Sequence, residues 1–260
     1  MGHIRAQSVV DAGLALSDQS VPDAEIAQIC GVAIKTVRRW RRLYRRQGLP
    51  RGGQDRRALC PRCEGGFLSD RAAYAHLLGW YLGDGSIAAH RRGVYLLAVF
   101  NDRRSPVNSS EVADCMRAVK PGARVHEHFR PGCRVTAAGW KHWPCLFPQH
   151  GPGRKHERPI VLEPWQVAIV EEYPGRFLRG LFHSDGCRVT NWTEKVVAGE
   201  RKRYQYPRYF FSNRSEGILQ LCEWALDLLE VQHRRSNRYS VSVARRESVA
   251  ILDRHVGPKS

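Results

Sequence analysis

Long hydrophobic segments are absent from this 260-residue sequence. No run of roughly 18 apolar residues occurs, although a membrane-spanning helix needs about 20. The first five residues, Met-Gly-His-Ile-Arg, also lack the charged and then apolar layout of a secretory signal peptide. We therefore expect a cytoplasmic protein without a membrane partner.

Cysteine is too scarce for a disulfide scaffold, because eight residues are spread over the whole chain. Only Cys60 and Cys63 have a diagnostic spacing, which is that of half a tetrahedral zinc site. No second Cys-x-x-Cys follows, so a complete Zn²⁺ site would need remote ligands such as Cys133, His142 or Cys145. The pair is thus either half of a structural zinc site or two free thiols at a domain boundary, and the missing second pair favours the thiols.

Acidic residues are also few, with 25 against 42 lysines and arginines and a net charge of +17. Such a charge indicates a polyanionic partner, and nucleic acid is the first to test. A membrane surface, an acidic protein or simple solubility could also account for the charge.

Residues 4–48 predict three short helices that form a small domain. Pro22, Asp23 and Glu25 mark the start of the second helix, and Gly31 supplies the turn after it. The first two helices carry apolar positions at Val9, Val10, Leu14, Ile26, Ala27 and Cys30. This spacing favours one buried face on each helix.

The third predicted helix, residues 34–46, directs Val37 and Trp40 inward and a set of basic residues outward. The basic set is Lys35, Arg38, Arg39, Arg41, Arg42, Arg45 and Arg46. The pattern resembles the helix-turn-helix of invertases, transposases and related regulators, which implies a DNA-binding domain over residues 1–50. The alternative is a three-helix domain with a solvated basic face.

Residues 51–70, rich in glycine, proline and arginine, then read as a basic linker with the Cys-x-x-Cys pair.

Two later segments, residues 77–85 and 177–186, match each other in register. The matched positions are Gly79 with Gly180, Gly83 with Ser184, and Asp84 with Asp185, 101 positions apart. An internal duplication explains the match. Small residues four apart on one helical face predict two helices in close contact, and the glycine after each aspartate predicts a left-handed helix cap.

Close packing of these helices about a two-fold axis would bring Asp84 and Asp185 together. Two like charges at two negative helix ends are unfavourable unless cations bind between them. Carboxylate oxygens are hard ligands, so Mg²⁺ is the natural cation beside a phosphate substrate.

The repeat extends past the motifs. Strands at 94–101 and 208–213 are followed by helices containing Cys115 and Cys222, and glycine-rich segments end at Lys155 and Lys259. This arrangement resembles the LAGLIDADG homing endonucleases over residues 71–260. The resemblance implies an α+β fold with a pseudo-two-fold, duplicated αββαββ domain, repeats at 71–164 and 165–260, and saddle-shaped antiparallel sheets. Leu82 and His183 stand where that family often has an acidic residue.

The resemblance implies a nucleoid-associated monomer that binds double-stranded DNA at a specific site and hydrolyses phosphodiester bonds with Mg²⁺. Asp84 and Asp185 would hold two or more ions, with Lys155 and Lys259 as basic catalytic residues. The alternative is a transcriptional regulator with a LAGLIDADG-like fold that binds DNA without cutting it; the paired aspartates favour the endonuclease.

Strand alternation over 234–243 predicts a polar face that contacts DNA and a face that is largely buried from Arg238 onward. The polar face would carry Arg234, Ser236, Arg238, Ser240 and Ser242, and Arg208 adds to the same charge. His126 and His128 also alternate on one face, and we interpret them as exposed strand or DNA-contact histidines rather than as metal ligands.

Overall fold

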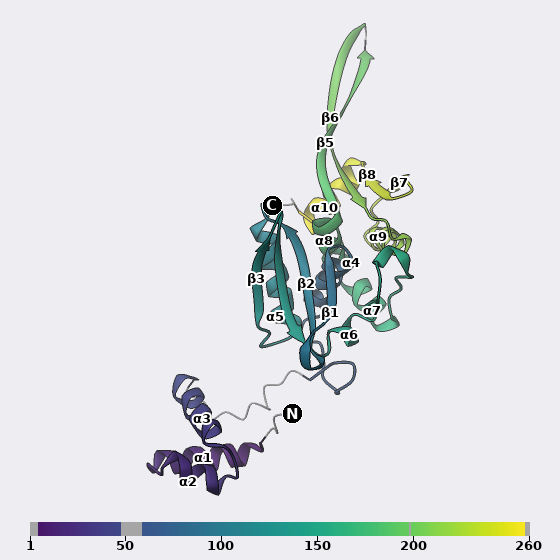
Figure 1. The fold of residues 1–260 in the computed structure, drawn as a ribbon. Coiled ribbons are helices and arrows are strands. Elements are labelled where there is room, and N and C mark those ends of the chain that lie inside the picture. The colour runs from purple at the N-terminus through teal and green to yellow at the C-terminus, as the bar shows by residue number, and fades with distance from the viewer. Residues whose placement is uncertain (1–4, 48–58, 198, 258–260) are drawn as a thin grey trace. The chain divides into compact units, whose positions relative to one another are not determined.

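The computed structural model describes residues 5–47, 59–197 and 199–257 and divides the chain into two compact units, with the boundary between Ala58 and Leu59 (Figure 1). Among the described residues, no helix combines the length and the apolar character that crossing a membrane requires.

The smaller unit contains helices α1 (Gln7–Asp18), α2 (Asp23–Ile29) and α3 (Ile34–Gln47). Its core is the predicted one: Val10 and Leu14 pack against Trp40, while Ile26 and Ala27 pack against Val37. Gly31 turns the chain between α2 and α3 with a φ of +59°, a conformation that favours glycine. The three predicted helices are therefore present.

The larger unit uses the same order of elements twice. The first copy comprises α4 (Arg71–Leu82), β1 (Gly85–Ala89), β2 (Tyr95–Asp102), α5 (Pro106–Val119), β3 (Val125–Arg130), β4 (Cys133–Trp140) and α6 (Trp143–Leu146). The second comprises α8 (Pro174–Asp185), β5 (Gly186–Val197), β6 (Glu200–Ser212), α9 (Glu216–Leu228), β7 (Arg234–Asn237), β8 (Ser240–Val243) and α10 (Arg246–His255). Between them lie the 3₁₀ turn η2 (Lys155–Glu157) and helix α7 (Pro164–Glu172), and another 3₁₀ turn, η1 (Arg91–Gly93), connects β1 to β2.

Both sheets are antiparallel and have the same strand order, β1-β2-β4-β3 in the first copy and β5-β6-β8-β7 in the second. The predicted α+β fold with a twice-used αββαββ arrangement is confirmed. Helices α4 and α8 lie side by side at the centre of the unit (Figure 1). One continuous apolar core includes residues of both copies, and a smaller, separate cluster of Ala98, Val135 and Ala137 lies in the first sheet.

Local chemistry explains where the two central helices begin. Asp70 accepts a hydrogen bond from the backbone N–H of Ala73 at 2.7 Å and caps α4. Pro174 opens α8, because the first turn of a helix does not need the N–H that proline lacks. The helix therefore begins at the proline itself.

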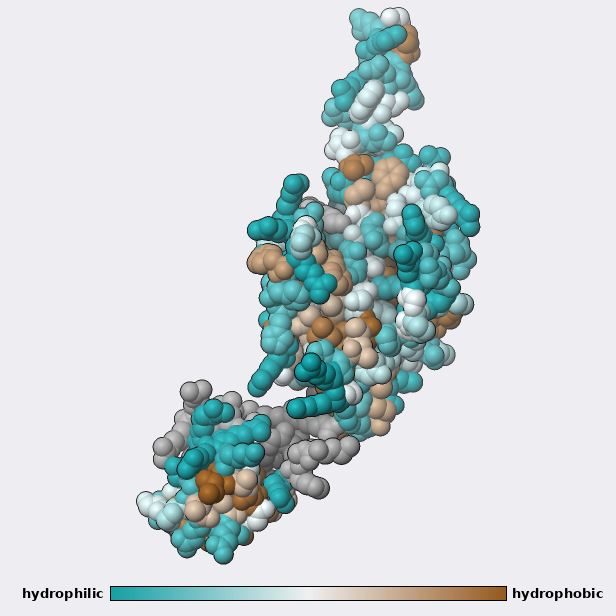
Figure 2. Space-filling model, in the orientation of Figure 1, coloured by the Kyte–Doolittle hydropathy of each residue, from teal (hydrophilic) through white to brown (hydrophobic). Residues whose placement is uncertain are grey.

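The hairpin of β5 and β6 is longer than the sequence predicted. Its register runs from Gly186 opposite Phe211 to Val197 opposite Glu200, and it projects from the rest of the unit (Figure 1). Most of its length is hydrophilic (Figure 2). The predicted strand at 208–213 covers only the end of β6. The earlier residues of β6 do not pack on the core, so they lack the apolar alternation that reveals a strand in the sequence.

The segment 234–243 forms two strands, β7 and β8, with a turn between them. Asn237 Oδ1 accepts a hydrogen bond from the Tyr239 backbone N–H at 2.8 Å and stabilises this turn. Ser242 is 2% exposed, and Arg208 Nε donates a hydrogen bond to its hydroxyl at 2.8 Å. The prediction that Ser240 and Ser242 lie on an accessible polar face is wrong, because both side chains are buried.

Candidate functional site

The two repeated helices cross in backbone contact at Gly79 and Gly180. A Cβ atom added to Gly79 would lie 2.3 Å from the carbonyl oxygen of Phe177. One added to Gly180 would lie 2.3 Å from the carbonyl oxygen of His76. Only glycine permits this approach, which agrees with the close contact that the spacing of small residues predicts.

The contact continues to the ends of both helices. A Cβ on Gly83 would lie 1.9 Å from Ser184 Oγ and 3.2 Å from Asp185 Oδ2. Ser184 keeps its hydroxyl on its own helix, where it bonds to the carbonyls of Gly180 at 3.0 Å and Leu181 at 2.8 Å. The carboxylate of Asp185 therefore lies beside the residue that immediately precedes Asp84.

The glycines after the two aspartates do not form left-handed caps, so that prediction is wrong. Gly186 is extended, with a φ of −108°, and Gly85 begins strand β1 without a positive φ. Their role is steric, because a Cβ on Gly85 would lie 2.5 Å from the Cα of Tyr81 and one on Gly186 would lie 2.7 Å from that of Phe182. In the second copy α8 ends at Asp185 and β5 begins at the next residue, whereas in the first copy Gly83 and Asp84 form a turn between α4 and β1.

Lys155, which begins η2, reaches the end of α4. Its ammonium group donates hydrogen bonds to the carbonyls of Tyr81, Leu82 and Gly83, the last two at 3.0 and 2.9 Å. The last carbonyls of a helix carry partial negative charge, so the ammonium group stabilises this helix end. Arg158 supports the preceding loop by donating hydrogen bonds to the carbonyls of Gln149, Pro152 and Gly153.

Both aspartates act electrostatically on Lys155. Burial lowers the pKa of Lys155 to about 8, and the charges of Asp185 and Asp84 oppose this shift. Two carboxylates therefore act on one amine at the paired helix ends.

An asparagine that we did not single out from the sequence holds one of the carboxylates. Asn213 Nδ2 donates a hydrogen bond to Asp185 Oδ2 at 2.7 Å. Asn101 holds the same register in the first copy, since Val99 pairs with Gly85 and Phe211 with Gly186. Asn101 is 4% exposed, and its amide nitrogen has no hydrogen-bond partner within the part of the chain that the structure describes. An asparagine at the end of both predicted strands was the available signal.

A cavity of about 420 Å³ opens beside the paired helix ends. Its lining is Leu82, Gly83, Lys155, His156, Asp185, Ser212, Asn213, Arg214, Ile218 and Tyr239. Asp185 and Lys155 border the cavity directly, and Asp84 follows Gly83 at its edge. The cavity thus combines carboxylate, amide and basic side chains.

The basic side chains predicted on α3 separate into two groups. Lys35, Arg39 and Arg42 are exposed. Arg38 and Arg41 reach back to Asp23 of α2, at 3.2 and 2.8 Å. The side chain of Arg45 lies outside the described residues, as does Lys259 near the end of the chain.

Two of the predicted DNA contacts, Arg208 and Arg234, share one face of the second sheet. Phe210 of β6 lies opposite Ser242, which in turn lies opposite Arg234. Arg208 is two residues from Phe210 and stacks over its ring at 4.7 Å. Arg234 and Arg238 are exposed, with Arg238 in the turn between β7 and β8.

The two departures from the family pattern are both internal. Leu82 is completely buried, and His183 is 2% exposed. The ring nitrogens of His183 lie 3.1 Å from Asn108 Oδ1 and 2.9 Å from the Val256 carbonyl oxygen. Of these two side chains, only the apolar Leu82 lines the cavity with Asp185.

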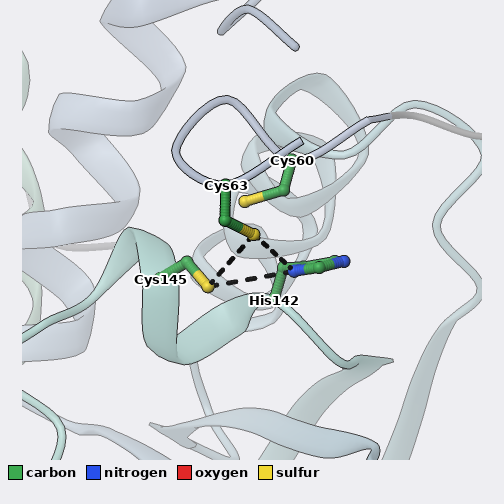
Figure 3. Close-up of side chains that lie close together, drawn as sticks. All are labelled: Cys60, Cys63, His142 and Cys145. Carbon is green, nitrogen blue, oxygen red and sulfur yellow. Dashed lines mark hydrogen bonds between the residues drawn. The ribbon is translucent and has the colours of Figure 1, made fainter. Parts of the chain in front are cut away.

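The Cys-x-x-Cys pair lies beside two of the three residues named from the sequence as possible remote metal ligands. The ligating atoms of Cys60, Cys63, His142 and Cys145 all lie within 4.8 Å of one another (Figure 3). Cys133 lies elsewhere, at the start of β4 opposite Asp102.

Comparison with known proteins gives one family match, to a homeodomain-like domain over residues 12–51. No curated protein matches the chain. Solved structures of similar fold include a variant of the homing endonuclease I-DmoI, with 12% identity and a TM-score of 0.47, covering 71% of this chain and 90% of that one. The LAGLIDADG meganuclease I-AabMI bound to uncleaved DNA has 10% identity and a TM-score of 0.44, with coverages of 70% and 83%. The homing endonuclease I-WcaI bound to its DNA recognition sequence has 13% identity and a TM-score of 0.42, with coverages of 74% and 83%.

Proposed function

We propose that this protein is a site-specific DNA endonuclease that depends on divalent cations. The observation that carries the proposal is the placement of Asp84 and Asp185 at the ends of two helices in backbone contact, with the ammonium group of Lys155 bound to the carbonyls at the end of α4. Two carboxylates can hold the divalent cations that catalyse phosphodiester hydrolysis, whereas a module that only binds DNA does not require paired carboxylates beside phosphates.

The donor set fits a hard cation, because Asp84 and Asp185 offer carboxylate oxygens and no sulfur lines the adjoining cavity. These two residues would hold Mg²⁺ or Mn²⁺, which when bound activates water and stabilises the leaving oxygen. Asn213 orients the Asp185 carboxylate through its 2.7 Å hydrogen bond. Asn101 occupies the equivalent position in the first copy, but its amide nitrogen bonds to none of the described residues, so we propose this orienting role for Asn213 alone.

Lys155 supplies positive charge where a phosphate would lie. Its three carbonyl acceptors fix the ammonium group at the end of α4. With a pKa of about 8, the amine can also give up or take up a proton near neutral pH. Lys259 is proposed for the second copy on sequence position alone.

The DNA surface that we propose has three parts. The first is one face of the second sheet, where Arg208 and Arg234 lie, together with Arg238 in the turn between β7 and β8. The second is the β5–β6 hairpin, with exposed Lys195, Arg201, Lys202 and Arg203; Arg203 stacks on Trp192, which is 52% exposed, at 4.5 Å. The third is α3, whose exposed basic residues suit the major groove. The internal two-fold makes a monomer sufficient.

The test uses a duplex selected from a randomised library by binding to the purified protein. We expect wild-type protein to cut this duplex in Mg²⁺ or Mn²⁺. Asp84→Asn and Asp185→Asn should each abolish double-strand cleavage while affinity for the duplex stays within a few-fold, because asparagine keeps the shape of the side chain but loses the charge that holds the cation. Cleavage gels and binding titrations on the same preparations measure both effects.

The matched control is Asp114→Asn, because Asp114 is an exposed carboxylate on α5 that pairs with Arg117. This variant should cut like wild type. Intact DNA after long incubation of wild-type protein with either cation would reject the endonuclease and leave a DNA-binding regulator as the function.

A further inference from the structure

A second group of ligating side chains lies where the larger unit begins. Cys60 and Cys63 belong to the irregular segment before α4. His142 immediately precedes α6, and Cys145 lies within that helix. Cys63 and Cys145 are 82 positions apart, yet Figure 3 shows the four side chains converging.

The spacing of the four side chains suits a tetrahedral ion. Cys63 Sγ lies 3.2 Å from His142 Nδ1 and 3.8 Å from Cys145 Sγ, and Cys145 Sγ lies 3.8 Å from the same nitrogen. A tetrahedral zinc ion with Zn–S bonds of about 2.3 Å separates two sulfur atoms by roughly 3.8 Å. An ion would therefore fit between these atoms with little movement of the backbone.

Neighbouring groups orient the ligands. The Arg62 backbone N–H donates to Cys60 Sγ at 3.4 Å, and the Cys60 backbone N–H donates to Glu64 Oε2 at 3.0 Å. The same carboxylate oxygen lies 3.1 Å from His142 Nε2. A carboxylate on this side of the ring favours a proton on Nε2 and leaves Nδ1, which faces the sulfur atoms, as the ligand. Lys141 binds the other oxygen of Glu64 at 3.0 Å.

We propose that Cys60, Cys63, His142 and Cys145 bind one zinc ion as a structural site. Three thiolates and an imidazole are soft ligands that select zinc over magnesium, and four protein ligands leave no open position for a substrate. The thiols release their protons when the ion binds. This site is separate from the paired aspartates and does not rest on the proposed nuclease activity.

The segment that the ion would hold has little apolar burial. Its other contacts include the hydrogen bond from Ser69 Oγ to the Ala118 carbonyl at 3.0 Å and the packing of Arg62 over the Trp165 ring at 4.8 Å. Among residues 59–70, only Cys60 is buried, and Leu59 and Phe67 are 50% and 83% exposed. An irregular segment with so little apolar burial gains little packing energy to offset its conformational entropy. The zinc ion would fix it to α6 of the first copy, at the point where the chain enters the larger unit.

The experiment measures zinc by mass spectrometry in full-length, untagged protein purified under reducing conditions without chelator. We expect about one zinc ion per chain in wild-type protein. Cys63→Ser and Cys145→Ser should lose most of it. Cys187→Ser should retain it, because Cys187 is an exposed cysteine on β5 outside the cluster. Replacement by Co²⁺ should give the visible absorption of a tetrahedral thiolate site in wild-type protein and in Cys187→Ser only.

A second readout guards against variants that lose zinc because they misfold. A strong chelator should lower the Tm of wild-type protein and raise amide exchange in residues 59–69, while Cys63→Ser should show both changes without chelator. The proposal is overturned if reduced wild-type protein, refolded with excess Zn²⁺, retains less than about a tenth of an ion per chain. A Cys63–Cys145 disulfide in protein isolated from cells would overturn it as well.

Discussion

His76 lies in α4 on the side that faces the second copy, and its side chain is 4% exposed. The indole N–H of Trp80 donates to Nε2 at 3.0 Å, and Cys115 Sγ lies 3.4 Å from Nδ1. Burial lowers the pKa of His76 to about 3, although the charge of Glu111 opposes this shift. The imidazole is therefore neutral at physiological pH and acts as a hydrogen-bonding core residue.

This lowered pKa predicts acid sensitivity. Between the unfolded pKa of about 6.5 and the folded value of about 3, the unfolded chain binds a proton at this site that the folded chain does not. The favourable effect of the neutral His76 side chain on the free energy of unfolding is therefore complete above about pH 6.5 and is lost as the pH falls towards 3. Between about pH 7 and about pH 4.5, wild-type protein should lose up to about 2–3 kcal/mol more stability than His76→Gln.

Urea unfolding at both pH values measures this difference. His126→Gln is the control, because His126 is exposed on β3, and it should follow wild type. Equal losses in wild type and His76→Gln would mean that the histidine is not held neutral in the folded protein.

At the scale of elements, the crossing of α4 and α8 decides the architecture of the site. Gly180→Ala separates two opposing effects. Helix propensity alone favours alanine over glycine by about 1 kcal/mol. The new Cβ, however, would lie 2.3 Å from the His76 carbonyl oxygen and 2.7 Å from the Trp80 nitrogen, both backbone atoms. We expect the clash to dominate and the free energy of unfolding to fall by about 1–3 kcal/mol.

Cleavage by Gly180→Ala should fall more than DNA affinity does, since the two helix ends would move apart. Gly139→Ala on β4 is the matched control, because its Cβ would meet only a side-chain carbon of Val94 at 3.4 Å. Denaturant unfolding of both variants gives the comparison. A stabilised Gly180→Ala would contradict the packing described for this crossing.

At the scale of the whole molecule, the distribution of basic residues predicts how each unit contributes to DNA binding. Lys35, Arg39 and Arg42 are exposed on α3 and are not held by Asp23. Each phosphate contact that is lost lowers the slope of log affinity against log salt by about 0.9. The triple change of these residues to glutamine should therefore weaken binding and reduce the slope by up to about 2.7.

Binding titrations of the full-length protein over a range of salt concentrations measure this slope. The control is Arg117→Gln, because Arg117 lies on α5, which packs against α4 and the first sheet, and it already pairs with Asp114. An unchanged slope in the triple variant would show that α3 does not contact DNA.

The sequence by itself determined the duplication, the two central helices and the three helices of the smaller unit. These features depend on local rules: apolar spacing, the Asp70 cap, and small residues four positions apart. The sequence also predicted the α+β arrangement, because helices and strands were recognisable in the same order in both copies. The same local pattern placed Asp84 and Asp185 at equivalent helix ends, and asparagines ended both predicted strands although their role was not recognised.

Tertiary structure alone decided the contacts between residues far apart in the chain. Lys155 reaches carbonyl oxygens more than 70 positions earlier, and His142 and Cys145 approach a cysteine pair about as distant. Arg208 covers Ser242, so a side chain predicted to be accessible is buried. Gly85 and Gly186 avoid clashes with the preceding helix instead of adopting a positive φ. Local patterns constrain which elements form, whereas close approach and burial depend on how those elements pack in space.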